Sequence, residues 1–189
     1  MSARMARGAA AAVLALLLAG CDAGPPPAPD PVLVLDAQGV VFRRGAAEYQ
    51  RFPFGVTRAR VERAAAAVYG KGSGRRSANP ECGAGPMAFT RYGPIQLNFQ
   101  HGRLVGWLME EGAVPAADAG QGGGGAAIIP GISAAELRAR SGARMVAGSA
   151  LPGEFAYTTP AGRIGGILRG QGEAARVESL FAGTNCFMR

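Results

Sequence analysis

The three cysteines are the residues of this 189-residue chain with the most distinctive chemistry. A cysteine can be joined to a lipid, oxidised to a disulfide or used as a thiolate nucleophile, and its surroundings decide which of these occurs. Cys21 stands directly after an apolar run near the start of the chain, whereas Cys82 and Cys186 stand in the middle and near the end. We therefore expect Cys21 to undergo different chemistry from Cys82 and Cys186.

The residues before Cys21 resemble the bacterial lipobox, the signal of a lipoprotein. Arg4 and Arg7 precede an apolar run over residues 9–18, and small residues come directly before the cysteine. A transmembrane anchor would need about 17 to 25 apolar residues, and a soluble secretory signal would not need the cysteine. Residues 1–20 are therefore expected to be a signal peptide that is removed.

Lipidation of Cys21 would tether the mature chain to a membrane. Acyl chains such as palmitate on this residue would hold the chain on the periplasmic face of a cell-envelope membrane. Residues 21–31 are rich in proline and are expected to form an extended linker. Asp22, directly after the cysteine, resembles the signal that retains lipoproteins at the inner membrane of enteric bacteria. The sequence nevertheless leaves the choice between the inner and the outer membrane open.

The positive charge of the chain shrinks once the signal is removed. The whole chain has 20 Lys and Arg against 13 Asp and Glu, a net charge of +7, and losing Arg4 and Arg7 leaves about +5. Such a balance can indicate nucleic-acid binding, but an exported, tethered chain would not meet nucleic acid. We expect the membrane itself, and an envelope protein, as partners, and no nucleic acid.

Cys82 and Cys186 are expected to form a disulfide. They are an even pair in a compartment where thiols oxidise. A catalytic thiolate would need a base or cation beside it, and His101, the single histidine, stands in a turn-like Gln-His-Gly segment. A bond between the two cysteines would join the end of the chain to its middle.

The apolar spacing after residue 32 predicts strands first and then a helix. Residues 32–35 and 40–42 are expected to form a β-hairpin. Thr57 is a credible N-cap of a helix that ends at Gly70. We expect the charged residues of this helix to form a solvated surface; they are Arg58, Arg60, Glu62 and Arg63. A polar loop is expected over residues 71–79, with Arg75 and Arg76 at its tip.

The remainder is expected to repeat this arrangement. Residues 88–108 form a predicted antiparallel meander that contains Trp107, which we interpret as core or as a platform for a ligand. Glycine-rich residues 112–127 read as a connector, and Ser133 begins a second helix with a capping box. Residues 162–168 have the same Gly-Arg pattern as residues 102–108.

The Gly-x-Thr/Ser helix entrance and the Gly-Arg turns resemble the BamE (SmpA/OmlA) type of small lipoprotein, and their duplication resembles the β-lactamase inhibitor protein family. The chain also looks like uncharacterised alphaproteobacterial lipoproteins that share Glu-Cys-Gly-Ala-Gly-Pro and a terminal Asn-Cys. These resemblances imply an α+β fold with two helix-plus-antiparallel-sheet repeats that share one core, preceded by a β-hairpin. The single domain would cover residues 32–189, with repeats at about 54–110 and 128–170 and a C-terminal segment over 171–189.

No acid, base, nucleophile or metal-ligand set converges in the sequence. We therefore expect a non-enzymatic protein-binding or scaffolding lipoprotein without a cofactor or metal, and the candidate binding-surface residues are Trp107, Tyr92, Arg75 and Arg76. The alternative is an envelope enzyme, for which Glu81, Glu154 and His101 are the candidates. Relatives that carry the name aspartate-semialdehyde dehydrogenase do not change this expectation, because the chain has no strand-glycine-helix fingerprint. An accessory lipoprotein without a dedicated ligand is the third possibility.

Overall fold

A computed structural model describes residues 33–44, 48–112, 117–119 and 128–187. The predicted signal peptide, Cys21, the linker over 21–31 and most of the glycine-rich connector lie outside these residues. The described part is built mainly from strands, which form two sheets. None of its helices is long and apolar enough to cross a membrane.

The smaller sheet has four strands in the order β3-β2-β1-β8. The expected hairpin is its central pair, because the Asp36–Gly39 turn joins apolar residues that become buried. A third strand adds antiparallel to β2, and a short strand from within the connector adds parallel to β1. The bounds are β1 (Leu33–Asp36), β2 (Gly39–Arg44), β3 (Glu48–Pro53) and β8 (Ala117–Ala119).

The larger sheet has eight strands, and every neighbouring pair in it is antiparallel. Its order is β4-β5-β6-β7-β12-β11-β10-β9, so β7 and β12 form the central pair. The bounds are β4 (Arg75–Asn79), β5 (Met87–Tyr92), β6 (Ile95–Gln100), β7 (Arg103–Glu110), β9 (Arg144–Met145), β10 (Glu154–Thr159), β11 (Gly162–Arg169) and β12 (Arg176–Gly183).

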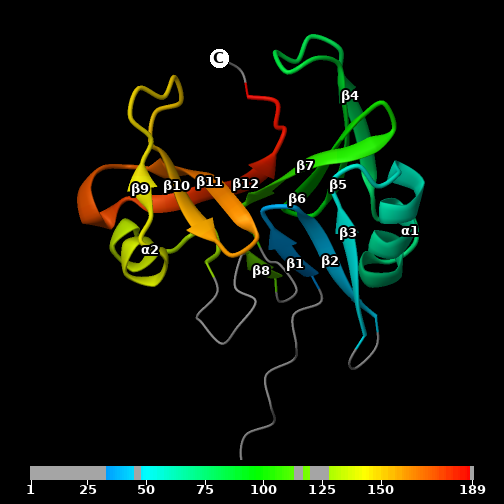
Figure 1. Cartoon of the computed structure of the whole chain (residues 1–189), viewed down its shortest axis with the longest axis horizontal. Coiled ribbons are helices and arrows are strands. Elements are labelled where there is room, and N and C mark those ends of the chain that lie inside the picture. The colour runs from blue at the N-terminus through cyan, green and yellow to red at the C-terminus, as the bar shows by residue number, and fades with distance from the viewer. Residues whose placement is uncertain (1–32, 45–47, 113–116, 120–127, 188–189) are drawn as a thin grey trace, which may run out of the picture.

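The two α-helices and the four-stranded sheet lie side by side over one face of the eight-stranded sheet (Figure 1). Helix α1 (Arg58–Tyr69) lies over the β4 side and helix α2 (Ala134–Ser141) over the β9 side, and a short 3-10 turn, Gly172–Ala174, precedes β12. Each helix buries small or branched apolar residues at helical spacing, as the sequence predicts.

Trp107 is at the centre of the shared core. Its side chain is fully buried, and its indole N–H donates to the Asp36 carbonyl oxygen at 2.8 Å, which joins the two sheets. Leu35, Phe52 and Phe99 are equally buried in the same cluster. Burial of this much aromatic and aliphatic surface is the main stabilising contribution to such a fold.

The expected fold class is wrong. Instead of two helix-plus-sheet units preceded by a hairpin, the strands form one continuous eight-stranded sheet, and the hairpin belongs to a separate four-stranded sheet. The helices are short, with 12 and 8 residues. Local periodicity identified most strands but could not show that β7 pairs with β12, a contact between residues about 70 positions apart.

The chain nevertheless contains two matched corners, where a helix entrance pairs with a strand. In the α1 corner, residues 55–57 bind residues 102–104 through Gly55 N–H to Leu104 O at 2.7 Å and Leu104 N–H to Val56 O at 2.8 Å. In the α2 corner, residues 131–133 bind residues 175–177 with the corresponding bonds at 2.7 and 2.9 Å. The first residue of each entrance is a glycine with φ near +95°, a conformation that favours glycine.

The matched corners correct the predicted alignment of the Gly-Arg motifs. Residues 102–108 lie in the α1 corner on β7, but residues 162–168 lie on β11 and make no corner. Arg103 donates to the Gly55 carbonyl at 2.8 Å, and its counterpart, Arg176 of β12, donates to the Gly131 carbonyl at 2.7 Å. The similar sequence of residues 162–168 therefore does not identify the strand that corresponds to β7, which is β12.

Candidate functional site

A charged network connects α1 to the outer strands of the eight-stranded sheet. Glu62 of α1, which is 9% exposed, accepts hydrogen bonds from Arg58 Nε at 2.8 Å, from the Thr90 hydroxyl and from the Arg76 guanidinium. Arg58 also donates to the Phe89 carbonyl at 2.9 Å and to the Thr90 hydroxyl at 2.8 Å. The network fixes the first turn of α1 against β4 and β5.

Glu62 is held in its charged form. Burial by itself raises the pKa of this carboxyl, but the hydrogen bonds from Arg76, Thr90 and Arg58 outweigh it and lower the pKa from 4.5 to about 2. A carboxylate with such a pKa does not exchange protons near neutral pH. Glu62 is therefore a structural anion, suited to positioning the arginines rather than to acid-base catalysis.

A hollow with apolar walls opens beside the start of α1. It has a volume of about 390 Å³, and its wall includes Ala78, Met87, Ala88 and Phe99, with Arg58 and His101 among its polar residues. The Arg58 guanidinium lies 4.9 Å from the centre of the Phe99 ring, a cation–π contact. A more open hollow of about 600 Å³ adjoins it across Arg58 and is lined mainly by polar residues.

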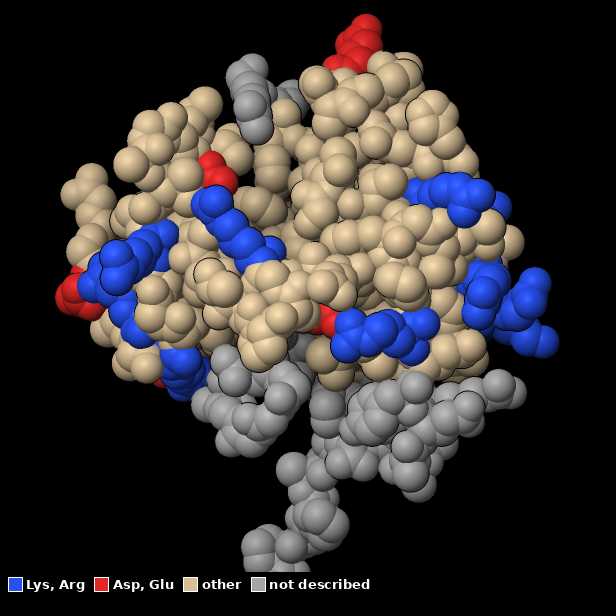
Figure 2. Space-filling model, viewed as in Figure 1, with Lys and Arg blue, Asp and Glu red and all other residues tan. Residues whose placement is uncertain are grey.

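The helix and the edge strand that border these hollows are strongly basic, and Arg58, Arg63 and Arg76 line the more open hollow. We call this surface the α1–β4 face and define it by the cations between residues 58 and 79, which are Arg58, Arg60, Arg63, Lys71, Arg75 and Arg76. Glu62 is the single acid in that stretch. Within the described part of the chain, Arg60, Arg63, Lys71 and Arg75 form no ion pair. In Figure 2 the side that carries α1 shows blue atoms with little red beside them.

The predicted binding-surface residues divide into two pairs. Trp107 and Tyr92 are 0% and 4% exposed, so both belong to the core and neither side chain is available at the surface. For Trp107 this agrees with its interpretation as a core residue. Both are buried because each points toward the helix-covered side of its strand, where Tyr92 stacks on Tyr69 with ring centres 5.3 Å apart. Arg75 and Arg76 are exposed and lie on β4.

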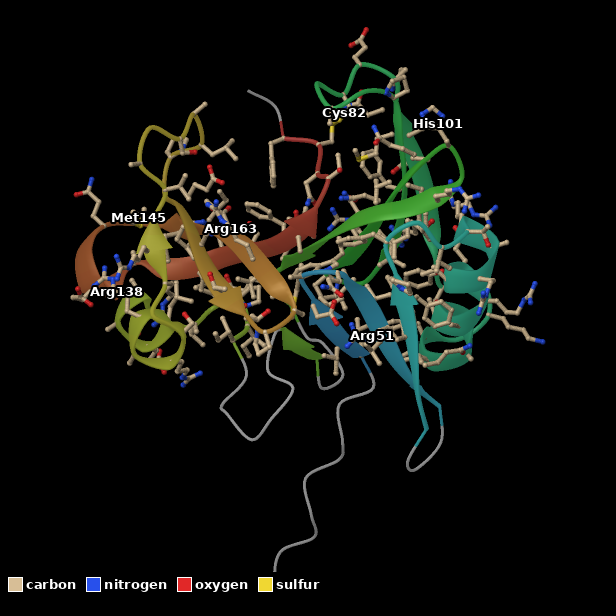
Figure 3. All side chains as sticks on the ribbon, viewed as in Figure 1. Arg51, Cys82, His101, Arg138, Met145 and Arg163 are labelled. Carbon is tan, nitrogen blue, oxygen red and sulfur yellow. A yellow bond between two sulfur atoms is a disulfide. The ribbon has the colours of Figure 1, made fainter. Side chains whose placement is uncertain are left out.

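Cys82 and Cys186 are paired, as the sequence predicts, with Cα atoms 5.6 Å apart and a sequence separation of 104. Figure 3 shows the disulfide at Cys82. Next to Cys186, Asn185 accepts a hydrogen bond from the Asn98 amide of β6 at 2.7 Å, which also holds the chain end on the sheet. A hollow of about 480 Å³ borders the disulfide. Cys21, the predicted lipid site, lies outside the described residues.

The three residues of the enzyme alternative do not come together. Glu154 lies on β10 and accepts from the Ser149 hydroxyl. It belongs to the α2 half of the molecule, by which we mean α2 and strands β9 to β12; the α1 half is α1 with strands β4 to β7. His101 lies in the β6–β7 turn and Glu81 in the turn after β4, at the end of the sheet that also carries Cys82 (Figure 3). Across the described residues, no group of three or more His, Cys, Asp or Glu side chains is arranged to hold a metal ion.

Sequence reasoning missed Glu62 and the strand character of β4. Glu62 was expected to be solvated, yet Arg58 and Glu62 stand four residues apart, a spacing at which opposite charges meet on a helix. β4 was expected to be a loop because its five residues, Arg-Arg-Ser-Ala-Asn, show no apolar alternation. No protein-family model matches the chain, and no curated protein or solved structure matches it either.

Proposed function

We propose that this chain is a lipid-tethered, non-enzymatic binding module of the cell envelope and that the α1–β4 face binds an acidic protein partner. The observation that carries the proposal is the apolar hollow of about 390 Å³, which Arg58 borders, on a face where four further cations form no ion pair among the described residues. An apolar cavity with a few placed polar groups is the usual form of a binding site. Cations around it select a negatively charged partner and speed its encounter.

The Glu62 network supports this proposal because it preorganises the site. Arg58 is fixed by bonds to Glu62, Phe89 and Thr90, so it does not have to lose side-chain freedom when a partner binds. The network itself offers no acid-base pair, since Glu62 stays ionised and its partners are arginines. A binding role needs no further group.

Lys71 offers a direct test, because it is the single lysine of the chain and is an exposed residue of the α1–β4 face. A zero-length carbodiimide joins a lysine amine to a carboxylate that touches it. We expect treatment of native host membranes to join the chain to one envelope protein through an amide between Lys71 and an Asp or Glu of that protein.

The matched control moves the lysine to the opposite edge of the sheet. The Lys71→Arg variant keeps the charge but has no amine to couple, and adding Arg144→Lys places the amine on exposed β9. The amide product should be lost in the first variant and should not return in the second. An equal yield from residue 144, or no product from Lys71 at any reagent concentration, would contradict the proposal.

A further inference from the structure

We propose that the acidic partner docks as an extended segment that adds a ninth strand to β4, and this inference rests on the proposed function. β4 is the outermost strand on its side of the eight-stranded sheet. All of its residues from Arg75 to Ala78 are exposed, and Asn79 is half-buried. A strand at such an edge presents backbone N–H and C=O groups to any extended chain that approaches it.

The two sides of β4 differ in what they offer to side chains of the added strand. Arg76 and Ala78 point to the helix side, because Arg76 reaches Glu62 of α1 and successive side chains alternate. Ala78 borders the apolar hollow. Arg75 points to the other side and has no counter-ion among the described residues.

This placement specifies a sequence pattern for the partner. The eight-stranded sheet is antiparallel throughout, so we assign an antiparallel docking segment. An apolar residue opposite Ala78 would enter the hollow, and an acidic residue opposite Arg75 would supply a counter-ion that Arg75 lacks among the described residues. A second acidic residue, opposite Arg76, would share that guanidinium with Glu62. Read from its N-terminus, the segment is apolar, any residue, acidic, acidic.

The other edges of the two sheets fit this role less well. At the far side of the eight-stranded sheet, β9 has only two residues, Arg144 and Met145, which limits the number of backbone hydrogen bonds that a partner could make. In the smaller sheet, the outermost strand β3 ends in Pro53, which has no N–H to donate, and the opposite edge strand β8 has only three residues. β4 has five residues without a proline.

The test measures binding of a labelled peptide, acetyl-Thr-Val-Leu-Thr-Glu-Glu-Thr-amide, to the full chain by fluorescence polarisation. Methylating the peptide nitrogens at alternate residues removes the N–H groups that point to one side of a strand. We expect one set of methylations to weaken binding about tenfold and the other set by less than about twofold. Equal effects of the two sets, or no binding of the unmodified peptide, would overturn the docking.

Variants of the chain and of the peptide complete the test. Arg75→Glu should weaken binding about tenfold, whereas Arg144→Glu on β9 should leave it unchanged, and a Lys-Lys peptide should not bind. If Lys71 couples to an envelope protein but the peptide fails, the β4 docking is wrong while the proposed function stands. If the peptide binds with the expected alternation but Lys71 couples to nothing, the docking stands and the proposed function is wrong.

Discussion

The two matched corners have the same backbone bonds but opposite electrostatics. At the start of α2, Ser133 and Glu136 form a complete capping box, so the helix supplies its own anion. At the start of α1, Thr57 makes no side-chain cap bond and Arg60 stands where α2 has Glu136. The acid of α1, Glu62, turns inward to Arg58 and Arg76 instead.

The arginines around the two helices show the same contrast. In the α2 half, Arg138 pairs with Glu173, Arg140 with Glu136 and Arg169 with Glu178, while the other three arginines of its described residues form no ion pair. In the α1 half, four cations of the α1–β4 face have no such partner among the described residues. The contrast is one of degree: residues 128–187 have four acids for six arginines, whereas residues 58–79 have one acid for six cations. The same backbone geometry therefore carries a nearly balanced surface at the α2 corner and a strongly positive surface at the α1 corner, which is why only the second is proposed to bind.

The largest expected effect comes from the disulfide, which ties the chain end to the α1 half only. Replacing both Cys82 and Cys186 by serine should lower the free energy of unfolding by about 4 kcal/mol, because a loop of 104 residues is no longer closed in the unfolded chain. Denaturant unfolding measures the change, and hydrogen exchange should show the greatest loss of protection in β4 and β5. An equal loss of hydrogen-exchange protection in the two halves would show that the disulfide does not stabilise the α1 half selectively.

Removing the acid at each corner should show that the buried network contributes more to the free energy of unfolding than the exposed cap does. Glu62→Ala leaves the partly buried Arg58 without its counter-ion and should cost about 3 kcal/mol. Glu136→Ala removes an exposed capping-box acid and should cost about 0.5 to 1 kcal/mol. Urea unfolding of the two variants measures both values; similar values would mean that the Glu62 network is no stronger than a surface cap.

Acid should weaken the α1 corner through Glu62. The folded pKa of Glu62, about 2, lies below its ordinary value of 4.5. Such a group contributes stability above pH 4.5, and this contribution is lost as the pH falls from about 4.5 to about 2. The free energy of unfolding should therefore fall less steeply in Glu62→Gln than in the wild type over this interval. Parallel pH curves for the two proteins would show that Glu62 is not held ionised by folding.

The smallest effect is expected for a substitution that gives the α1 corner the capping acid of the α2 corner. Arg60→Glu places an acid three residues after Thr57, where it can complete a capping box and complement the helix dipole. Thermal unfolding should show a gain of a few tenths of a kcal/mol, while binding of the acidic peptide to the full chain should weaken. Arg140→Glu on α2 is the control, and it should not change peptide binding.

The sequence predicted the local elements better than their assembly. Both helices were predictable because apolar spacing and the glycines after them mark their ends. Strand β6 was predictable because Ile95, Leu97 and Phe99 alternate with polar residues. The sheet order was not, because it depends on contacts between distant strands. The two halves of the eight-stranded sheet meet at β7 and β12, whose sequences do not show which strands pair.

The candidate site was predictable only in its charges. Arg75 and Arg76 were expected at an exposed position and lie there. Aromatic residue type alone could not distinguish surface from core for Trp107 and Tyr92, because both roles suit an aromatic side chain. The apolar hollow is formed by residues of four separate segments, so no local sequence pattern predicts it.

The central claim is that the α1–β4 face, and not the α2 side, holds the partner. The most direct measurement is quantitative mass spectrometry of the envelope protein that co-purifies with the full chain from the native host. With Arg63→Glu and Arg75→Glu together, recovery of this protein should fall at least about tenfold, while Arg138→Glu and Arg144→Glu together should leave it unchanged. Recovery that is equally reduced by the two pairs, or reduced only by the second, would contradict the account.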